Sequence, residues 1–236
     1  MVEKAEMFAS SIVCLGAFNS PIFSPDWLER QRLIGEQDAE VARKAPSYVV
    51  SGQVTQYETS WFAIQVLENQ FSLTSKGALT GAFKDLFVSI LHLLPQTPIT
   101  AIGINFMGHF KMAKLDDLHQ IGDALTPKAI WRELFPSEDS PPGLASLTIQ
   151  VRKLDRKEIT AKGRDWLNIT IQPSAIIAGG VYMAYNDHHD IPLNDDSSLT
   201  AAERAAQIVE ERWETSNDDA LKVFNGILSK TLSSSK

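Results

Sequence analysis

The chain has 236 residues, of which 44% are hydrophobic and 22% charged, a composition that excludes wholesale disorder and collagen-like architecture. Its formal net charge of −7 argues against a protein that coats nucleic acid or an anionic membrane with its whole surface. The single cysteine, Cys14, excludes an internal disulfide and sulfur-based metal clusters, and it favours a cytoplasmic location.

A strand at residues 12–18 is the first element that the sequence predicts. The preceding segment carries Glu3 and Glu6 against one lysine, which is the wrong charge for the start of an export signal. No stretch of the chain reaches the roughly 18 consecutive apolar residues that a membrane-spanning helix needs. We therefore expect a buried strand here and no membrane contact.

Two helices are predicted next, at residues 25–34 and 37–44. Ser24 can cap a free backbone N–H, and Pro25 has no N–H to satisfy at the first helical position, so this pair is typical of a helix start.

Extended runs at 48–57 and 61–74 follow and predict paired strands, because apolar residues alternate with polar ones along the second run. The period then changes to three and four residues over 78–94, which predicts an amphipathic helix. A last extended run covers 99–110. The resulting order is β-α-β-β-α-β, so we predict an α+β fold with a ferredoxin-like N-terminal half. This match is one of topology, and no residue motif assigns the chain to a family.

The second half begins with predicted helices at 115–125 and 126–135, the latter with an apolar stripe of Ile130, Trp131 and Leu134. Proline, serine and glycine residues then mark residues 136–143 as a loop.

Three strands near 147–154, 166–171 and 181–185 predict a second, three-stranded sheet. A long helical region is expected from 200 to 228, starting with a capping box between Thr200 and Glu203.

This organisation divides the chain into a ferredoxin-like unit at residues 1–112, a helical connector with its loop at 113–143, and a β-rich unit with C-terminal helices at 144–236. The alternative that these parts form one continuous globule stays open.

The motifs of common catalytic sites are absent from the sequence. It contains no nucleophile elbow, no dinucleotide or phosphate-binding glycine loop, no paired-cysteine motif and no metalloprotease helix. Cys14 lies between apolar neighbours, which indicates a buried, unreactive thiol and no nucleophile. These absences favour a protein without enzymatic activity.

One polar cluster stands out at the end of the last predicted strand, and it comprises Asn186, Asp187, His188, His189 and Asp190. Imidazoles and carboxylates at this spacing could bind a divalent metal through His188, His189 and Asp190, or supply a general base. Neighbouring strand residues point to opposite faces, so both histidines reach one metal only if the chain turns there. Asn and Asp are also ordinary turn residues, and absence of a cofactor is the favoured hypothesis.

Further binding candidates lie outside this cluster. Asn105 and His109 would share one face of their strand, so they could line a pocket together with Asn186 and Asp187. Trp213 and Phe224 lie on the apolar stripes of the C-terminal helical region. Those stripes either cover the second sheet or pair with another chain, in which case the two aromatic residues would anchor a protein partner or a homodimer.

A basic hairpin is predicted between Arg152 and Arg164. The segment from Arg152 to Asp165 has a local charge of +3, and it could contact phosphates. Nucleic acid is the less favoured partner for this hairpin, because acidic residues are interleaved with the basic ones and the hairpin contains no aromatic residue.

Two hypotheses of function follow from the sequence. The first is a non-enzymatic binding or assembly protein that recognises another protein or itself. The second is a metal-dependent hydrolase or nuclease built on Asp187, His188, His189 and Asp190.

Overall fold

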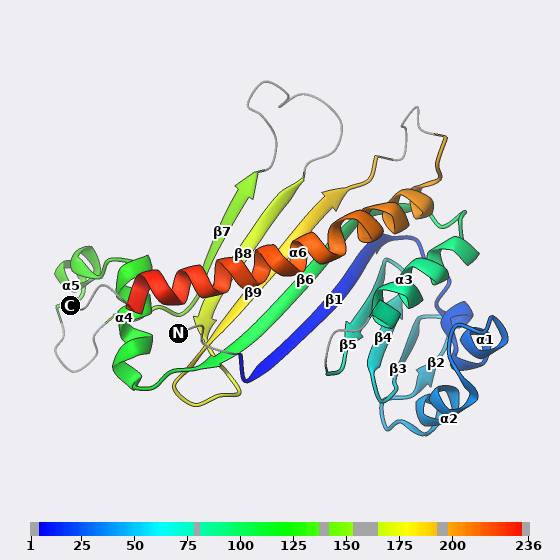
Figure 1. The fold of residues 1–236 in the computed structure, drawn as a ribbon, viewed down its shortest axis with the longest axis horizontal. Helices are drawn as coiled ribbons and strands as arrows, with labels where there is room; N and C mark the ends of the chain where they lie inside the picture. Colours follow the sequence, from blue (N-terminus) through cyan, green and yellow to red (C-terminus); the bar gives the residue numbers. More distant parts are fainter. Residues whose placement is uncertain (1–4, 78–80, 137–141, 153–164, 193–197, 233–236) are drawn as a thin grey trace.

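The structure is a computed structural model that describes residues 5–77, 81–136, 142–152, 165–192 and 198–232. Within these residues, nine strands form one antiparallel sheet in the order β2-β3-β4-β5-β1-β6-β9-β8-β7. The helices gather on one face of this sheet and leave its other face open (Figure 1). The fold is therefore α+β and dominated by the sheet.

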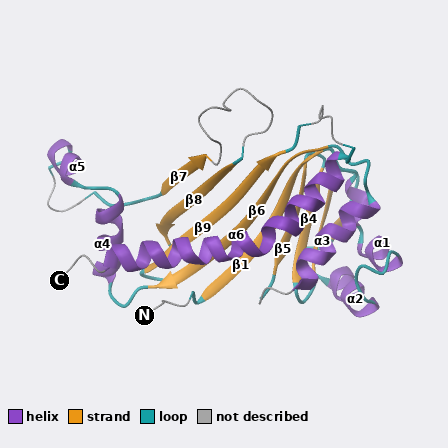
Figure 2. Ribbon diagram, turned by 45° about the horizontal axis from the view of Figure 1, so that its top comes forward, coloured by secondary structure: helices purple, strands orange, loops and turns teal. Residues whose placement is uncertain are grey.

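The strands are β1 (Met7–Gly16), β2 (Val49–Val50), β3 (Val54–Glu58), β4 (Phe62–Leu67), β5 (Gln70–Ser75), β6 (Ile99–Lys111), β7 (Leu147–Arg152), β8 (Trp166–Pro173) and β9 (Gly180–Asp190). The helices are η1 (Ser20–Phe23), α1 (Pro25–Arg30), α2 (Glu36–Lys44), α3 (Gly81–Leu93), α4 (Leu115–Leu125), α5 (Ala129–Leu134) and α6 (Ala201–Leu232). Figure 2 shows α3 and α6 lying across the strands.

The predicted ferredoxin-like half and the separate three-stranded sheet are both wrong. Between the helices the chain makes the meander β3-β4-β5 where one strand pair was expected. The three strands expected as a second sheet join the first through β6, which pairs with β9 over residues 101–111 and 180–190. Local periodicity located most of these strands, but it holds no information on which strand pairs with which across 80 residues of chain.

The two halves of the sheet repeat one order of elements. The first half runs from β1 through the helices α1 and α2 to the meander β3-β4-β5 and then to α3. The second runs from β6 through α4 and α5 to the meander β7-β8-β9 and then to α6. Apart from the two-residue strand β2, the sheet order is symmetric about the β1–β6 pair, so a pseudo-two-fold axis passes between these two central strands.

The helix α6 forms because its buried positions recur every three or four residues. These positions are Ala202, Ala205, Ala206, Val209, Trp213, Ser216, Ala220, Phe224, Leu228 and Thr231. The predicted capping box is confirmed, since the Thr200 backbone N–H donates to Glu203 Oε2 at 2.7 Å and the Glu203 N–H donates to Thr200 Oγ1 at 3.2 Å. None of the helices in the described ranges has the length and apolar character to span a membrane.

The outer strands of the first half are covered by η1, and α2 also contacts β3. Thr55 Oγ1 on β3 donates to the Ser20 carbonyl at 2.7 Å, and Tyr57 Oη donates to the Phe23 carbonyl at 2.8 Å. In the second half, α4 packs against the end of α6, where Gln120 Nε2 donates to the Thr231 carbonyl at 3.1 Å. Figures 1 and 2 show α5 beyond the end of the sheet, so β7 and β8 have no such cover.

Candidate functional site

The predicted polar cluster lies on β9 and is split by the alternation of that strand. The register of β9 on β6 and β8 places Asn186, His188 and Asp190 on the open face, and Asp187 and His189 on the face toward α6. The chain does not turn between the two histidines, so they point to opposite sides of the sheet. Within the described ranges, no three His, Cys, Asp or Glu side chains are arranged to hold a metal ion.

On the open face, the structure brings Asn105 and Asn186 together. Asn186 Nδ2 donates to Asn105 Oδ1, and Asn105 Nδ2 in turn donates to the Ser11 carbonyl at 3.3 Å. Gly103 leaves room for this pair, because a Cβ at that position would lie 2.8 Å from Asn186 Nδ2. The two amides are therefore committed to each other across the β6–β9 pair.

His188 lies on the same face but in a different setting. Its ring stacks on Trp166 with 4.0 Å between centroids and 12° between planes, and its Nε2 lies 3.0 Å from Asp190 Oδ1. This arrangement holds the imidazole flat on the sheet surface.

His109 does not converge with His188. It pairs with Tyr182 on β9, six positions from His188 and roughly 20 Å away along the strand. Its Nδ1 lies 2.9 Å from Ser174 Oγ, and that oxygen also accepts the Ile177 N–H at 2.9 Å, so Ser174 caps a turn. Burial lowers the pKa of His109. The open face thus holds separate polar pairs and no shared centre.

A buried ionic network occupies the face of β9 that α6 covers. The Asp187 side chain is fully buried, and its Oδ2 accepts from Arg212 Nη2 at 3.0 Å and from Ser216 Oγ at 2.5 Å. Its Oδ1 lies 3.0 Å from His189 Nε2. His189 Nδ1 lies 2.9 Å from Asp165 Oδ2. Arg212 and Ser216 of α6 thus hold the carboxylate of Asp187, so the network ties α6 to β9.

The pKa of His189 is set by two opposing effects. Burial favours the neutral ring, but the carboxylates of Asp165 and Asp187 outweigh burial and raise the pKa above its ordinary value. A raised pKa in the folded state stabilises the fold fully below pH 6.5, and this contribution is lost as pH rises through the folded pKa.

We expect the stability difference between the parent and His189→Gln to be largest near pH 5.5 and to shrink by pH 8.5, because only the parent gains stability from the charged imidazole. Urea unfolding across this range measures the difference. A difference in stability that widens as pH rises would mean that burial has the larger effect and lowers the pKa of His189. That result would contradict the raised pKa.

Trp213 and Phe224 lie in the core beneath α6. The Trp213 ring lies 5.4 Å from that of Phe83 on α3 and 5.2 Å from that of Phe106 on β6, and Phe224 packs on Phe110 at 5.9 Å. Both side chains are almost fully buried within the chain. Trp213 joins α3 and α6 to the sheet, and Phe224 joins α6 to the sheet. Neither side chain is exposed to a partner.

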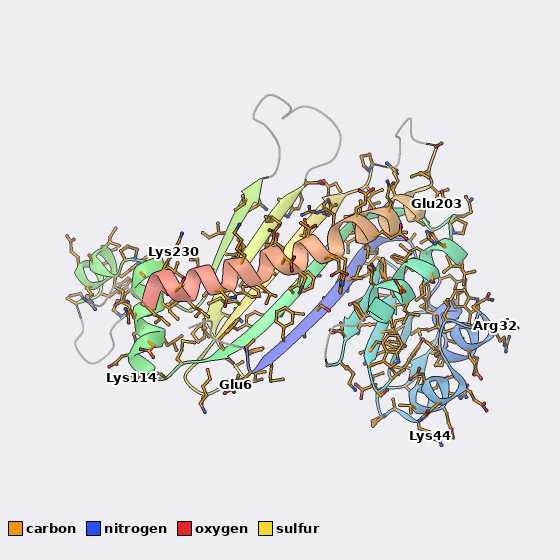
Figure 3. The ribbon with its side chains drawn as sticks, in the orientation of Figure 1. Glu6, Arg32, Lys44, Lys114, Glu203 and Lys230 are labelled. Atoms are coloured by element: carbon orange, nitrogen blue, oxygen red, sulfur yellow. The ribbon has the colours of Figure 1, made fainter. Side chains whose placement is uncertain are left out.

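An open groove of about 550 Å³ runs between the C-terminal half of α6 and β8. Its floor and walls are mostly apolar, and they consist of Leu125, Leu167, Tyr185, Val223, Gly226, Ile227 and Thr231. Asp219, Lys222 and Lys230 form its charged rim along α6; Lys230 is labelled near the end of α6 in Figure 3. On β7, Ile149 and Val151 pair with Ile169 and Leu167 of β8 and are 46% and 44% exposed on the same face.

The groove also contains an unsatisfied polar atom. The hydroxyl of Tyr185 is buried and has no hydrogen-bond partner among the described residues. Burial raises the pKa of Tyr185, and the negative charges of Asp187 and Asp219 add to this effect. The hydroxyl is therefore a neutral donor, and a buried donor of this kind costs free energy until it is paired.

The helix α5 carries a second exposed apolar surface. Ile130, Trp131, Leu134 and Phe135 are 60%, 49%, 60% and 63% exposed, and their spacing puts them on one side of the helix. A sequence stripe of this kind normally faces a core, so the periodicity located the helix but gave no sign of its exposure. The groove itself left no local signal in the sequence.

The predicted basic hairpin from Arg152 to Arg164 and most of the predicted loop at 136–143 lie outside the described residues. Comparison of the chain with protein families and with curated proteins finds no match in either. Hypotheses of function therefore rest on the groove, on α5 and on the polar pairs of the sheet.

Proposed function

We propose that this protein is a non-enzymatic binding protein that recognises a protein partner through the groove between α6 and β8. The observation that carries the proposal is the apolar lining of this groove, which lies over strands whose counterparts in the first half are covered by η1. Contiguous apolar surface of this kind is typical of protein interaction sites, and a groove beside a helix suits an amphipathic helix.

The electrostatics of the groove agree with this use. Its rim carries charged side chains only along α6, whereas its floor is apolar, which is the arrangement of a binding site with an apolar centre and a polar edge. The lone, buried cysteine supports a cytoplasmic setting for such a protein.

The alternative of a metal-dependent hydrolase or nuclease at residues 187–190 gains no support from the strand geometry. His188 and His189 point to opposite faces of β9, and Asp187 is already bound by Arg212 and Ser216. We therefore do not carry this alternative further.

A photo-crosslinking amino acid at Val223, inside the groove, tests the proposal in cells that naturally make the protein. The matched control places the same amino acid at Leu221, which is 39% exposed on the same helix and does not line the groove. We expect a discrete protein adduct from position 223 that position 221 does not give. No adduct at position 223, or the same adducts at both positions, would contradict the proposal.

A further inference from the structure

We infer that the groove is filled by helix α5 of a second copy of this chain, so that two chains exchange α5 across a two-fold axis. This inference rests on the proposed function and names its partner. It starts from two exposed apolar surfaces in the same half of one chain: among the described residues, no element covers the groove and the stripe of α5 packs against none.

The pseudo-symmetry of the fold indicates what should cover the groove. In the first half, the chain between β1 and the meander packs onto the meander through η1, whose Phe23 ring lies 5.0 Å from Phe71 of β5 and 6.4 Å from Trp27 of α1. The segment at the same place in the second half includes α5, with Trp131 and Phe135 as its aromatic residues. In that half, α5 lies beyond the end of the sheet (Figure 2).

The charges of the two surfaces are complementary. The apolar stripe of α5 is flanked by Arg132 on one side and Glu133 on the other, given 100° per residue. The α6 rim carries Lys222 and Lys230 against Asp219. When the apolar stripe of α5 lies in the groove and Glu133 faces α6, the carboxylate of Glu133 lies beside Lys222. This pairing of opposite charges favours that orientation over the one in which Arg132 faces α6.

The exposed stripe of α5 is large enough to contribute to a dimer interface. Four large apolar side chains, each about half exposed, offer on the order of 400 Å². Exchanged twice across a two-fold axis, the two helices bury about 800 Å² of their own surface, and the two grooves bring the total to about 1,000 Å², the lower limit of a specific interface. Reciprocal exchange also closes the assembly at two chains.

Light scattering on the purified full-length protein tests the exchange. We expect a mass twice the 26.1 kDa of one chain, and we expect Trp131→Glu to weaken the dimer by about 100-fold, because a large aromatic anchor is replaced by a charge. Ile176→Glu is the matched control: Ile176 is 58% exposed in the turn between β8 and β9, and this variant should keep the dimer mass.

Circular dichroism should give the same spectrum and melting temperature for the diluted parent and for Trp131→Glu, since Trp131 is exposed within one chain. A parent that is monomeric at all concentrations, or a Trp131→Glu variant that stays as dimeric as the parent, would overturn the exchange. If the parent is monomeric while position 223 still crosslinks to another protein, the exchange fails and the proposed function stands. If position 223 gives no adduct either, both fail.

Discussion

Replacing Asp187 with alanine is expected to lower the free energy of unfolding by about 3–5 kcal/mol, the usual cost of removing one partner from a buried ion pair. The Asp187 side chain is fully buried, and it accepts from Arg212 and Ser216 while facing His189. Its removal leaves the buried Ser216 hydroxyl without its acceptor, and it takes the carboxylate partner from Arg212, whose side chain is 31% exposed.

The matched control is Asp190→Ala, on the same strand. Asp190 lies on the open face, where its side chain is 35% exposed and its oxygen faces His188, so we expect a loss below about 1 kcal/mol. Urea unfolding of both variants measures the difference. Equal losses for the two variants would contradict the structural role assigned to the buried network.

Trp213→Ala is expected to cost about 3–5 kcal/mol, because it removes a large aromatic side chain from a packed core and leaves a cavity. The Trp213 ring contacts Phe83 of α3 and Phe106 of β6. It is therefore the point at which the two helices meet the sheet near the pseudo-two-fold axis.

Leu221→Ala serves as the control on the same helix. Leu221 is 39% exposed, and its truncation should change the free energy of unfolding by less than about 0.5 kcal/mol. Thermal or urea unfolding compares the two. If Trp213→Ala unfolded with the same midpoint as Leu221→Ala, the ring would not be a core residue.

The sequence analysis located elements with a strong local period. The three- and four-residue spacing of 78–94 corresponds to α3, and the Thr200–Glu203 capping box starts α6. The C-terminal helical region is one helix, continuous over 201–232. Residues 214–219 in its middle are all polar, and among them the buried Ser216 donates to Asp187.

Strand pairing could not be predicted, and the ferredoxin-like arrangement was wrong for that reason. The pairing of β6 with β9 joins residues 69 to 89 positions apart in the chain, whereas periodicity is a local property. The same limit applies to α5. Its stripe of Ile130, Trp131 and Leu134 is visible in the sequence, but the sequence does not say whether that stripe meets its own sheet or another chain.

The candidate site was predicted in part. The alternation rule correctly separated His188 from His189, and the pairing of Asn105 with Asn186 follows the shared face expected for these strands. His109 lies apart from them because its position on β6 meets Tyr182, far along β9. The groove could not be foreseen, since it is formed by α4, α6, β8 and β9 together.

The exchange of α5 into the groove of a second copy is tested most directly by mixing two variants, Glu133→Lys and Lys222→Glu. Each variant alone brings like charges together at both interfaces, so we predict that each forms a dimer weaker than the parent by about tenfold or more. In the mixed dimer, Lys at 133 meets Glu at 222, and Glu133 meets Lys222, so opposite charges return at both interfaces.

We therefore predict that sedimentation of the equimolar mixture gives a mixed dimer as tight as the parent dimer, while each variant alone remains mostly monomeric at the same total concentration. A mixture that associates no more tightly than either variant alone would contradict the reciprocal exchange of α5.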